Sequence, residues 1–250
     1  MRIIKIVEEI KSTQYNNIER AAETISDSII SGHVCFLFGC GHSIIPVVEM
    51  YPRYGGVLGF MPILELPLSH FTRLIGDLGF PQFDFLENSE GYGKRIMKNY
   101  SVHKEDSMIV FSNAGASPVV IDVAISFKEM GGGKLIGVTS LEHSKNVKSR
   151  HSSGKKLYEL ADIVIDNCTP EGDAIVPIPF LNQRAGPSST IGFTVVANLI
   201  SLKVIEKLLG KGYRPLINPV RGHDPEADKI MEKILIEYSK RFKEHLAESL

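Results

Sequence analysis

Short apolar runs alternate with helical patterns along most of this chain, and this alternation constrains its fold more than any other feature. Apolar runs occupy residues 33–38, 107–112, 134–140 and 161–166, and a shorter one occupies 57–62. Their apolar residues are continuous and do not alternate with polar ones. This indicates strands that are covered on both faces, as in a parallel sheet between helices. The pattern therefore predicts a doubly wound α/β fold.

The predicted helices follow from apolar spacing and from cap residues. The segment 117–131 shows both, with Ser117 at the N-cap, Pro118 at the first helical position and Gly131 at the end. The other predicted helices span residues 4–31 (one or two helices), 43–50, 89–100, 188–209 and 225–247. Residues 62–90 contain several prolines and glycines, so we expect a long loop or cap with little helix there. A polar stretch covers 141–160, and 161–166 is expected to be the last strand.

The chain shows no internal repeat and no linker, which favours a single domain over residues 1–250. We expect an N-terminal helical segment at 1–32, a core at about 33–210 and a C-terminal helix at about 225–247. The helix at 188–209 is apolar almost all round, which is typical of a core helix or of a subunit interface.

Charge and cysteine content exclude several classes of protein. The formal net charge is −1, and a nucleic-acid or membrane-surface protein would carry a basic excess. No apolar run approaches the roughly 20 residues that a membrane helix needs, and the acidic residues near the N-terminus do not fit a secretory signal. Three cysteines, an odd number, suggest a reducing compartment, so we expect a cytoplasmic protein. We interpret these thiols as structural.

Glycines and hydroxyl residues follow three of the predicted strands. These segments are Gly39-Cys40-Gly41-His42-Ser43, Ser112-Asn113-Ala114-Gly115-Ala116-Ser117 and Thr139-Ser140. Ligands of parallel sheets bind at the carboxyl ends of strands, where glycines allow close approach and helix N-termini offer amide donors to anions. The segments therefore predict a site for a phosphate monoester that needs no basic patch. Simple turns, and a helix cap in the case of Ser117, are the alternatives. Neither G-x-G-x-x-G nor G-x4-G-K-[ST] is present.

These motifs resemble those of the sugar isomerase (SIS) domain family. The segments FGCGHS, VEMYPRYGG, FSNAGASPVVIDVA, RHSSGKKLYELADIVIDNCTPEGDA and GPSSTIG resemble more closely the UPF0309 group, which is also described as phosphoheptose-isomerase-like. The resemblance covers residues 36–192. It implies a five-stranded parallel α/β sandwich that binds phosphosugars at the three loops, but it does not assign a reaction.

The resemblance also implies which residues hold the phosphate. Hydroxyls of the family's phosphate site fall at Ser43, Ser112, Ser117 and Ser140. Gly41, Asn113, Gly115 and Thr139 belong to the same loops and complete the predicted binding set. Ala114 stands where many SIS proteins have a second serine, so one donor is missing or replaced. A weaker or differently oriented phosphate is therefore expected.

Aldose–ketose isomerisation needs a base that moves a proton between two carbons and a donor near the carbonyl. Glu49, six residues after Ser43, is one candidate, although it can instead pair with Arg53 at i+4. His42, beside Ser43, is a second candidate and can instead cap or pack. In phosphoheptose isomerases a metal-binding histidine and glutamate resemble the positions of Glu49 and Arg53. Their metal set is therefore not reproduced, and we assign no metal and no other cofactor.

Two later segments supply the remaining candidates. His151 and Lys155 lie in the donor-rich stretch 150–155, as an acid/base group and a phosphate clamp, unless this is a solvated loop. Glu171 and Asp173 follow the last predicted strand, as a possible base and a sugar-binding group, although Asp beside Gly is also a common turn residue. Ser189 opens the apolar helix as a ligand contact or as an N-cap. The cluster 221–224 has no assigned place.

We therefore hypothesise a phosphosugar isomerase that works through an enediolate on a phosphorylated sugar or amino sugar. A homodimer or homotetramer with shared sites is expected, because SIS sites often form between protomers and the apolar helix offers a surface to bury. One alternative is a phosphosugar sensor or adaptor without catalysis. Another is a phosphosugar lyase or etherase, which uses the same loops.

Overall fold

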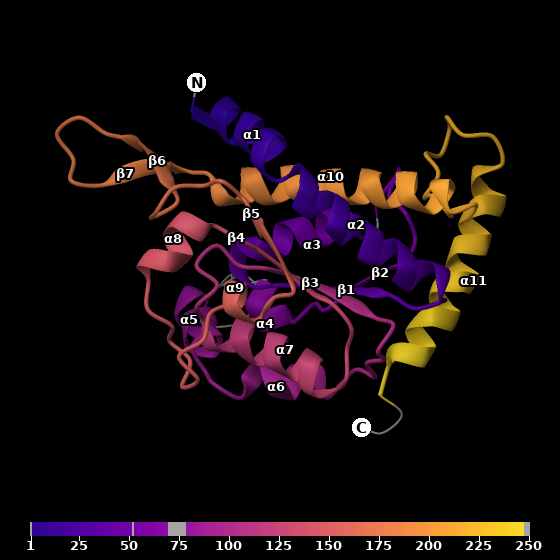
Figure 1. The fold of residues 1–250 in the computed structure, drawn as a ribbon, viewed down its shortest axis with the longest axis horizontal. Coiled ribbons are helices and arrows are strands. Elements are labelled where there is room, and N and C mark those ends of the chain that lie inside the picture. The colour runs from indigo at the N-terminus through magenta and orange to yellow at the C-terminus, as the bar shows by residue number, and fades with distance from the viewer. Residues whose placement is uncertain (1, 52, 70–78, 248–250) are drawn as a thin grey trace.

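The computed structural model describes residues 2–51, 53–69 and 79–247, and it contains a five-stranded sheet in the order β2-β1-β3-β4-β5 (Figure 1). The strands are β1 (Cys35–Gly39), β2 (Phe60–Pro62), β3 (Ser107–Phe111), β4 (Leu135–Thr139) and β5 (Ile163–Asp166). All four strand pairs are parallel. Every residue of β1, β3 and β4 is buried. The predicted parallel α/β sheet is therefore confirmed.

Two groups of helices cover the two faces of the sheet, above and below it in Figure 1. One face carries α1 (Arg2–Thr13), α2 (Tyr15–Ile30), α3 (Ile45–Met50) and α10 (Ser189–Gly210). The other carries α4 (Leu66–Ser69), α5 (Phe80–Glu87), α6 (Tyr92–Met97), α7 (Pro118–Glu129) and α9 (Leu157–Leu160). A short helix, α8 (Leu141–Asn146), follows β4, and α11 (Ala227–His245) packs across one end of the sheet.

The strand residues divide between two hydrophobic cores, one on each face. Cys35 and Leu37 of β1 join the core under α2 and α10, whereas Phe36 and Phe38 join the core above α7. Gly137 of β4 faces α9, and a Cβ there would approach the Leu157 side chain to 3.1 Å. Burial on both faces explains why the apolar runs show no alternation.

Residues 4–31 form two helices, which is one of the two expected arrangements. The structure differs from the sequence-based expectations in three other places. The helix expected from Ser43 begins as the 3-10 turn η1 (Gly41–Ile44) before α3. The stretch 141–160 contains α8 and α9. The prediction that 161–166 is the last strand is wrong, because β6 (Ala174–Pro177) and β7 (Arg184–Pro187) form an antiparallel hairpin. Every residue of β7 is exposed, so it has no buried-strand pattern.

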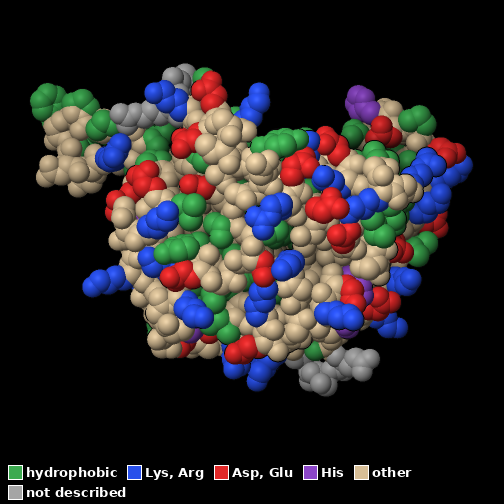
Figure 2. Space-filling view, in the orientation of Figure 1, with side chains coloured by type: hydrophobic (Ala, Val, Ile, Leu, Met, Phe, Trp, Pro, Cys, Tyr) green, Lys and Arg blue, Asp and Glu red, His purple; other side chains and the backbone are tan. Residues whose placement is uncertain are grey.

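The expected cap at 62–90 contains α4 and α5, while its residues 70–78 lie outside the described part of the chain. Helix α10 is buried along one face and leaves Leu202 and Leu209 more than half exposed. Within the described ranges, no helix is long and apolar enough to span a membrane. Figure 2 shows acidic and basic side chains interspersed over the face that it draws.

Candidate functional site

The first of the three loops, residues 39–43, turns sharply because of its two glycines. A Cβ on Gly39 would lie 2.1 Å from the carbonyl oxygen of Ser43, so no other residue fits there. Gly41 has φ +58°, and a Cβ on it would meet the ring of Phe83 in α5 at 2.9 Å. This tight turn leaves His42 exposed and Ser43 partly exposed at the carboxyl end of β1.

The second loop, residues 112–117, leads from β3 into α7. The Ser112 hydroxyl accepts a hydrogen bond from the Gly115 amide (3.1 Å), and Gly115 has φ +57°. Ser117 is the N-cap residue of α7, but its side chain makes no capping hydrogen bond. The amides in the first turn of a helix have no intrahelical acceptor, and the helix dipole favours an anion there. Pro118 has no amide hydrogen, and the Val120 amide donates to the Ser117 carbonyl (3.1 Å), so the donors left for an anion are the Ser117 hydroxyl and the Val119 amide.

The third loop begins at Thr139 and Ser140, which are both fully buried. The Thr139 hydroxyl donates to the Asn113 carbonyl (3.0 Å), which ties the third loop to the second. The Ser140 hydroxyl donates to the Thr169 carbonyl (2.5 Å) and accepts from the His143 amide (3.1 Å), so it caps α8. The structure thus gives Ser140 a supporting role between loops.

A buried polar network that sequence reasoning missed supports these loops from the end of β5. The Asn113 side-chain oxygen accepts from Asn167 Nδ2 (2.9 Å) and from the Thr169 hydroxyl (3.0 Å). Asn167 and Thr169 are almost completely buried. Because both bonds use the oxygen, the NH₂ group of Asn113 is left to donate to a ligand. The only sequence pattern that pointed to this network is the run of polar residues directly after the predicted strand at 161–166.

Glu49 lies on α3, directly after the first loop, and its carboxylate has two partners. One oxygen accepts from Arg53 (2.8 Å) and the other from Asn198 Nδ2 of α10 (3.1 Å). The i+4 pair with Arg53 considered from the sequence is therefore present. The side chain is 19% exposed, so the carboxylate is held in place without being closed off from solvent.

The stretch 147–157 runs beside the second loop, because the amides of Arg150 and Leu157 donate to the carbonyls of Ala116 and Gly115. Nδ1 of His151 accepts from the Ser153 amide (3.0 Å), so Nε2 carries the ring proton and faces Asp122 Oδ1 at 3.3 Å. Lys155 is exposed, and its ammonium group has no partner within the described ranges.

The candidates after β5 are engaged in local contacts. Glu171 is exposed and accepts from Asn146 of α8 (3.0 Å). Asp173, at φ +65°, accepts from the amides of Ser188 (2.8 Å) and Ser189 (2.5 Å), and from the Ser189 hydroxyl (3.0 Å). Asp173 therefore caps α10 and joins β6 to it. The turn alternative for Asp173 is therefore present, whereas the N-cap residue of α10 is Ser188 and Ser189 is the first residue of the helix.

Comparison with known proteins places this geometry in a family. The family model described as SIS domain matches residues 1–140. A UPF0309 protein of Halalkalibacterium halodurans is 34% identical over 240 residues, which cover 96% of this chain and 93% of that protein. A UPF0309 protein of Caldanaerobacter subterraneus subsp. tengcongensis is 34% identical over 247 residues, covering 96% of both. The chain belongs to the UPF0309 group of SIS-domain proteins.

A solved phosphoheptose isomerase from Neisseria gonorrhoeae has the same fold as this UPF0309 protein. The TM-score is 0.52 at 13% sequence identity, with 82% of this chain and 94% of that one covered. The family resemblance and the fold predicted from the loop motifs are thus confirmed.

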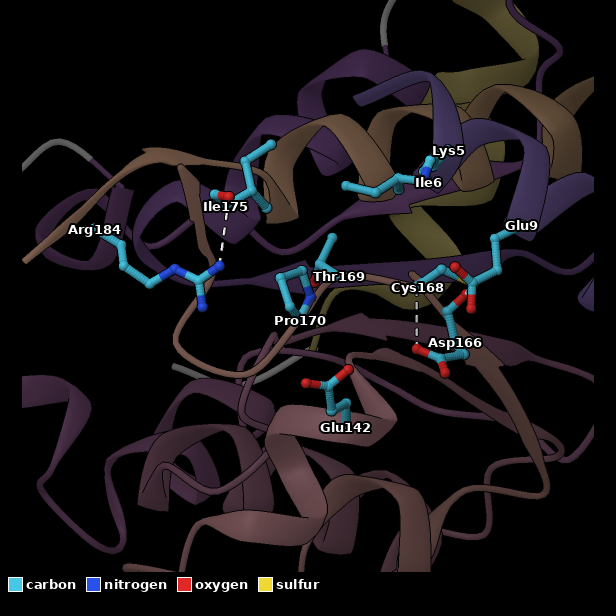
Figure 3. Close-up of a pocket in the computed structure, with 10 residues that line it drawn as sticks. All are labelled: Lys5, Ile6, Glu9, Glu142, Asp166, Cys168, Thr169, Pro170, Ile175 and Arg184. Carbon is cyan, nitrogen blue, oxygen red and sulfur yellow. Dashed lines mark hydrogen bonds between the residues drawn. The ribbon is translucent and has the colours of Figure 1, made fainter. Parts of the chain in front are cut away.

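A pocket of about 320 Å³ opens beside the loops of this UPF0309 protein, at the carboxyl end of β5 (Figure 3). It is lined by Lys5, Ile6, Glu9, Glu142, Asp166, Cys168, Thr169, Pro170, Ile175 and Arg184. Thr169 connects the pocket to the second and third loops, because its hydroxyl bonds to Asn113 and its carbonyl accepts from Ser140. Burial, followed by the charge of Asp166, raises the pKa of Cys168 to about 12. Its thiol is therefore not a nucleophile at neutral pH.

Proposed function

We propose that this UPF0309 protein binds a phosphorylated sugar at its three loops and interconverts the aldose and ketose forms. The observation that carries the proposal is the uncapped Ser117 hydroxyl at the N-terminus of α7, with glycine and hydroxyl loops on the neighbouring strands. Gly39 of β1 pairs with Phe111 of β3, and Phe111 pairs with Val138 of β4. The three loops therefore leave the same edge of the sheet side by side.

Neutral donors suit a phosphate that must be bound and released. Ser43, Ser117 and the Val119 amide of α7 supply them, and the dipole of this 12-residue helix adds a favourable field. Membership of the SIS family supports the sugar-phosphate class of ligand. When a phosphate is bound at these loops, the sugar attached to it can extend either along α3 or toward the β5 pocket.

The proton transfers are assigned to the first loop and the helix that continues it. The Glu49 carboxylate takes a proton from one carbon of the sugar and returns it to the neighbouring carbon, which balances the enediolate step. His42 moves the proton between the two oxygens. Arg53 and Asn198 hold the Glu49 carboxylate in a fixed position, which favours it over Glu171 on the exposed outer loop. His151 remains the alternative acid.

The β5 pocket fits the hydroxyl end of a sugar better than it fits a second anion. Its charged lining is mixed, with Lys5 and Arg184 opposing Glu9, Glu142 and Asp166. Carboxylates accept hydrogen bonds from hydroxyls but repel phosphate. The pocket is therefore the alternative direction for the sugar, whereas Glu49 as the base requires the reacting carbons to lie along α3.

Binding is tested by thermal shift with a panel of sugar phosphates and the matching free sugars. A ligand that binds only the folded state raises the Tm. Ser43→Ala and Ser117→Ala each remove a hydrogen bond to a charged group, worth about 1.5–3 kcal/mol, so affinity should fall roughly 10- to 100-fold. Ser239→Ala, at an exposed serine of α11, is the matched control. Equal shifts in all three variants would contradict the site.

Catalysis is tested separately by proton exchange. An enzyme that forms an enediolate exchanges the hydrogen beside the carbonyl, so incubation in D₂O should place deuterium at that carbon in the NMR spectrum. Glu49→Gln should abolish exchange while retaining the thermal shift, and His42→Asn should slow it by about 10²–10⁴-fold. A thermal shift without exchange would establish a sensor or adaptor, and an eliminated or hydrolysed product would establish a lyase or etherase.

A further inference from the structure

A cluster of two histidines and an aspartate lies at the opposite edge of the sheet from the loops. His33 precedes β1, Asp106 precedes β3, and His245 is the last residue of α11. One nitrogen of each ring and one carboxylate oxygen all lie within 4.8 Å of one another. Asp106 and His245 are buried, whereas the His33 side chain is 25% exposed.

The hydrogen bonds around His245 fix which of its nitrogens faces the aspartate. Nδ1 lies 2.6 Å from the Arg241 carbonyl oxygen, which can only accept, so Nδ1 carries a proton. In the neutral ring, Nε2 therefore presents a lone pair to Asp106 Oδ1 at 2.8 Å. Two lone pairs at this distance require a cation between them.

The contacts of His33 distinguish between a proton and a metal ion as this cation. Its Nδ1 is buried, lies 3.3 Å from the same Asp106 oxygen and has no hydrogen-bond partner among the described residues. A proton on His245 Nε2 would satisfy the contact between His245 and Asp106, but it would leave His33 Nδ1 unpartnered. A metal ion bonded to all three atoms satisfies both.

We propose that His33, Asp106 and His245 bind one zinc ion, with water as the fourth ligand on the exposed side of His33. Zinc bonds of about 2.0–2.1 Å place tetrahedral ligands about 3.3 Å apart. The measured 3.3 Å between His33 and Asp106 matches this spacing, and the 2.8 Å contact must open by about 0.5 Å. The partly exposed His33 provides an entry path.

The surroundings of the cluster provide the support that metal ligands need. The Arg241 carbonyl orients the His245 ring, as an outer-shell acceptor does in zinc sites. The second Asp106 oxygen accepts from the His103 amide (2.7 Å), and Oδ1 also accepts from the Val34 amide (3.1 Å). The positive Arg241 guanidinium pairs with Glu237 and donates to the His33 carbonyl. The Asp106 carboxylate is therefore fixed in position in the absence of a metal ion.

A zinc ion here would join three distant parts of the chain. It would tie the C-terminal end of α11 to the starts of β1 and β3, which lie side by side where α11 crosses the sheet (Figure 1). Farther along α11, Tyr238 packs against Tyr51, the residue that follows α3. The ion would therefore act as a structural staple at the edge of the sheet opposite the loops.

The test uses the full chain, stripped with a chelator and titrated with Zn²⁺ alone. We expect one zinc per chain by mass spectrometry of the metal, and a rise in Tm. At free zinc 100-fold above Kd, the ratio of folded to unfolded chains should rise about 100-fold. His33→Ala should weaken binding by more than about 100-fold, because loss of an outer-shell partner alone costs 10- to 100-fold.

His103→Ala is the matched control. Its ring packs 5.2 Å from the rings of both His33 and His245 but contributes no ligand atom. Zinc binding should persist in this variant. Absence of one-to-one binding, or equal binding in wild type and His33→Ala, would overturn the proposal. Co²⁺ added to the wild type gives a reading that no variant's folding affects: tetrahedral absorption bands support the site, and their absence refutes it.

Discussion

At the scale of the residue, Gly115 shows how one position serves both the fold and the proposed phosphate site. It lies at φ +57°, and a Cβ there would meet Leu157 at 3.0 Å and the Thr139 hydroxyl at 3.2 Å. Gly115→Ala should therefore destabilise the protein by about 1–3 kcal/mol and move the second loop. Urea unfolding measures the loss, and thermal shift with a sugar phosphate measures binding.

Gly154→Ala separates crowding from backbone strain in this experiment. Gly154 also has positive φ (+69°), but a Cβ on it meets nothing within 4 Å. We expect a smaller loss of stability and unchanged ligand binding. If both variants lose the same stability and binding, contact with Leu157 and Thr139 is not what requires glycine at 115.

Thr169 is the residue whose hydroxyl connects most of the buried network. Its single hydroxyl hydrogen is shared between the side-chain oxygens of Asn167 (2.7 Å) and Asn113 (3.0 Å). Thr169→Val keeps the shape and removes the hydroxyl, which leaves buried amide oxygens with fewer partners and should cost about 1–3 kcal/mol. Thr194→Val on α10 is the control, because that hydroxyl bonds only to a carbonyl of its own helix. Equal urea midpoints for the two variants would contradict this account.

At the scale of the element, a ladder of ion pairs joins α2 to α10. Glu19 contacts Lys203 and Lys207, and these lysines lower the pKa of Glu19 to about 2 through hydrogen bonds. A depressed carboxyl pKa contributes stability that is complete above about pH 4.5 and is lost as the pH falls toward 2. Because exposed pairs are weak, the contribution is about 1 kcal/mol.

Glu19→Gln should therefore lower stability at pH 6 and have little effect near pH 2. The measurement is the urea midpoint of both proteins across this range. Glu8→Gln is the control, since Glu8 is exposed on α1 and makes no ion pair within the described chain. A difference between wild type and Glu19→Gln that stays constant down to pH 2 would show that the lysines do not act through the carboxylate charge.

At the scale of the whole molecule, the sequence predicted the features that a local residue pattern encodes, and it did not predict contacts between distant segments. The runs at 107–112 and 134–140 are apolar on both faces, so their burial as β3 and β4 was predictable. Strand β7 is exposed and carries no such pattern. The contacts of Asn113 with Asn167, and of His33 with His245, depend on strand register and helix docking, which no local pattern encodes.

The whole molecule also carries exposed apolar side chains on an extended arm. The hairpin of β6 and β7 extends away from the body beside the start of α1 (Figure 1). In its turn, Phe180 is fully exposed at φ +67° and Leu181 is 60% exposed, while Ile4 of α1 is 52% exposed. Large apolar side chains that are this exposed on an extended arm are typical of an interface. We predict a homodimer that uses this arm.

Phe180→Glu should convert the dimer to a monomer, because a charge in an apolar contact cannot be desolvated without a partner. Light scattering coupled to gel filtration measures the mass. Phe85→Glu, at a phenylalanine of α5 that is 70% exposed, is the control and should leave the mass unchanged. If the site is shared between protomers, the monomer should also lose deuterium exchange while keeping its helical circular dichroism. A monomer that still exchanges would place the complete site within one chain, and an unchanged mass would exclude the arm from the interface.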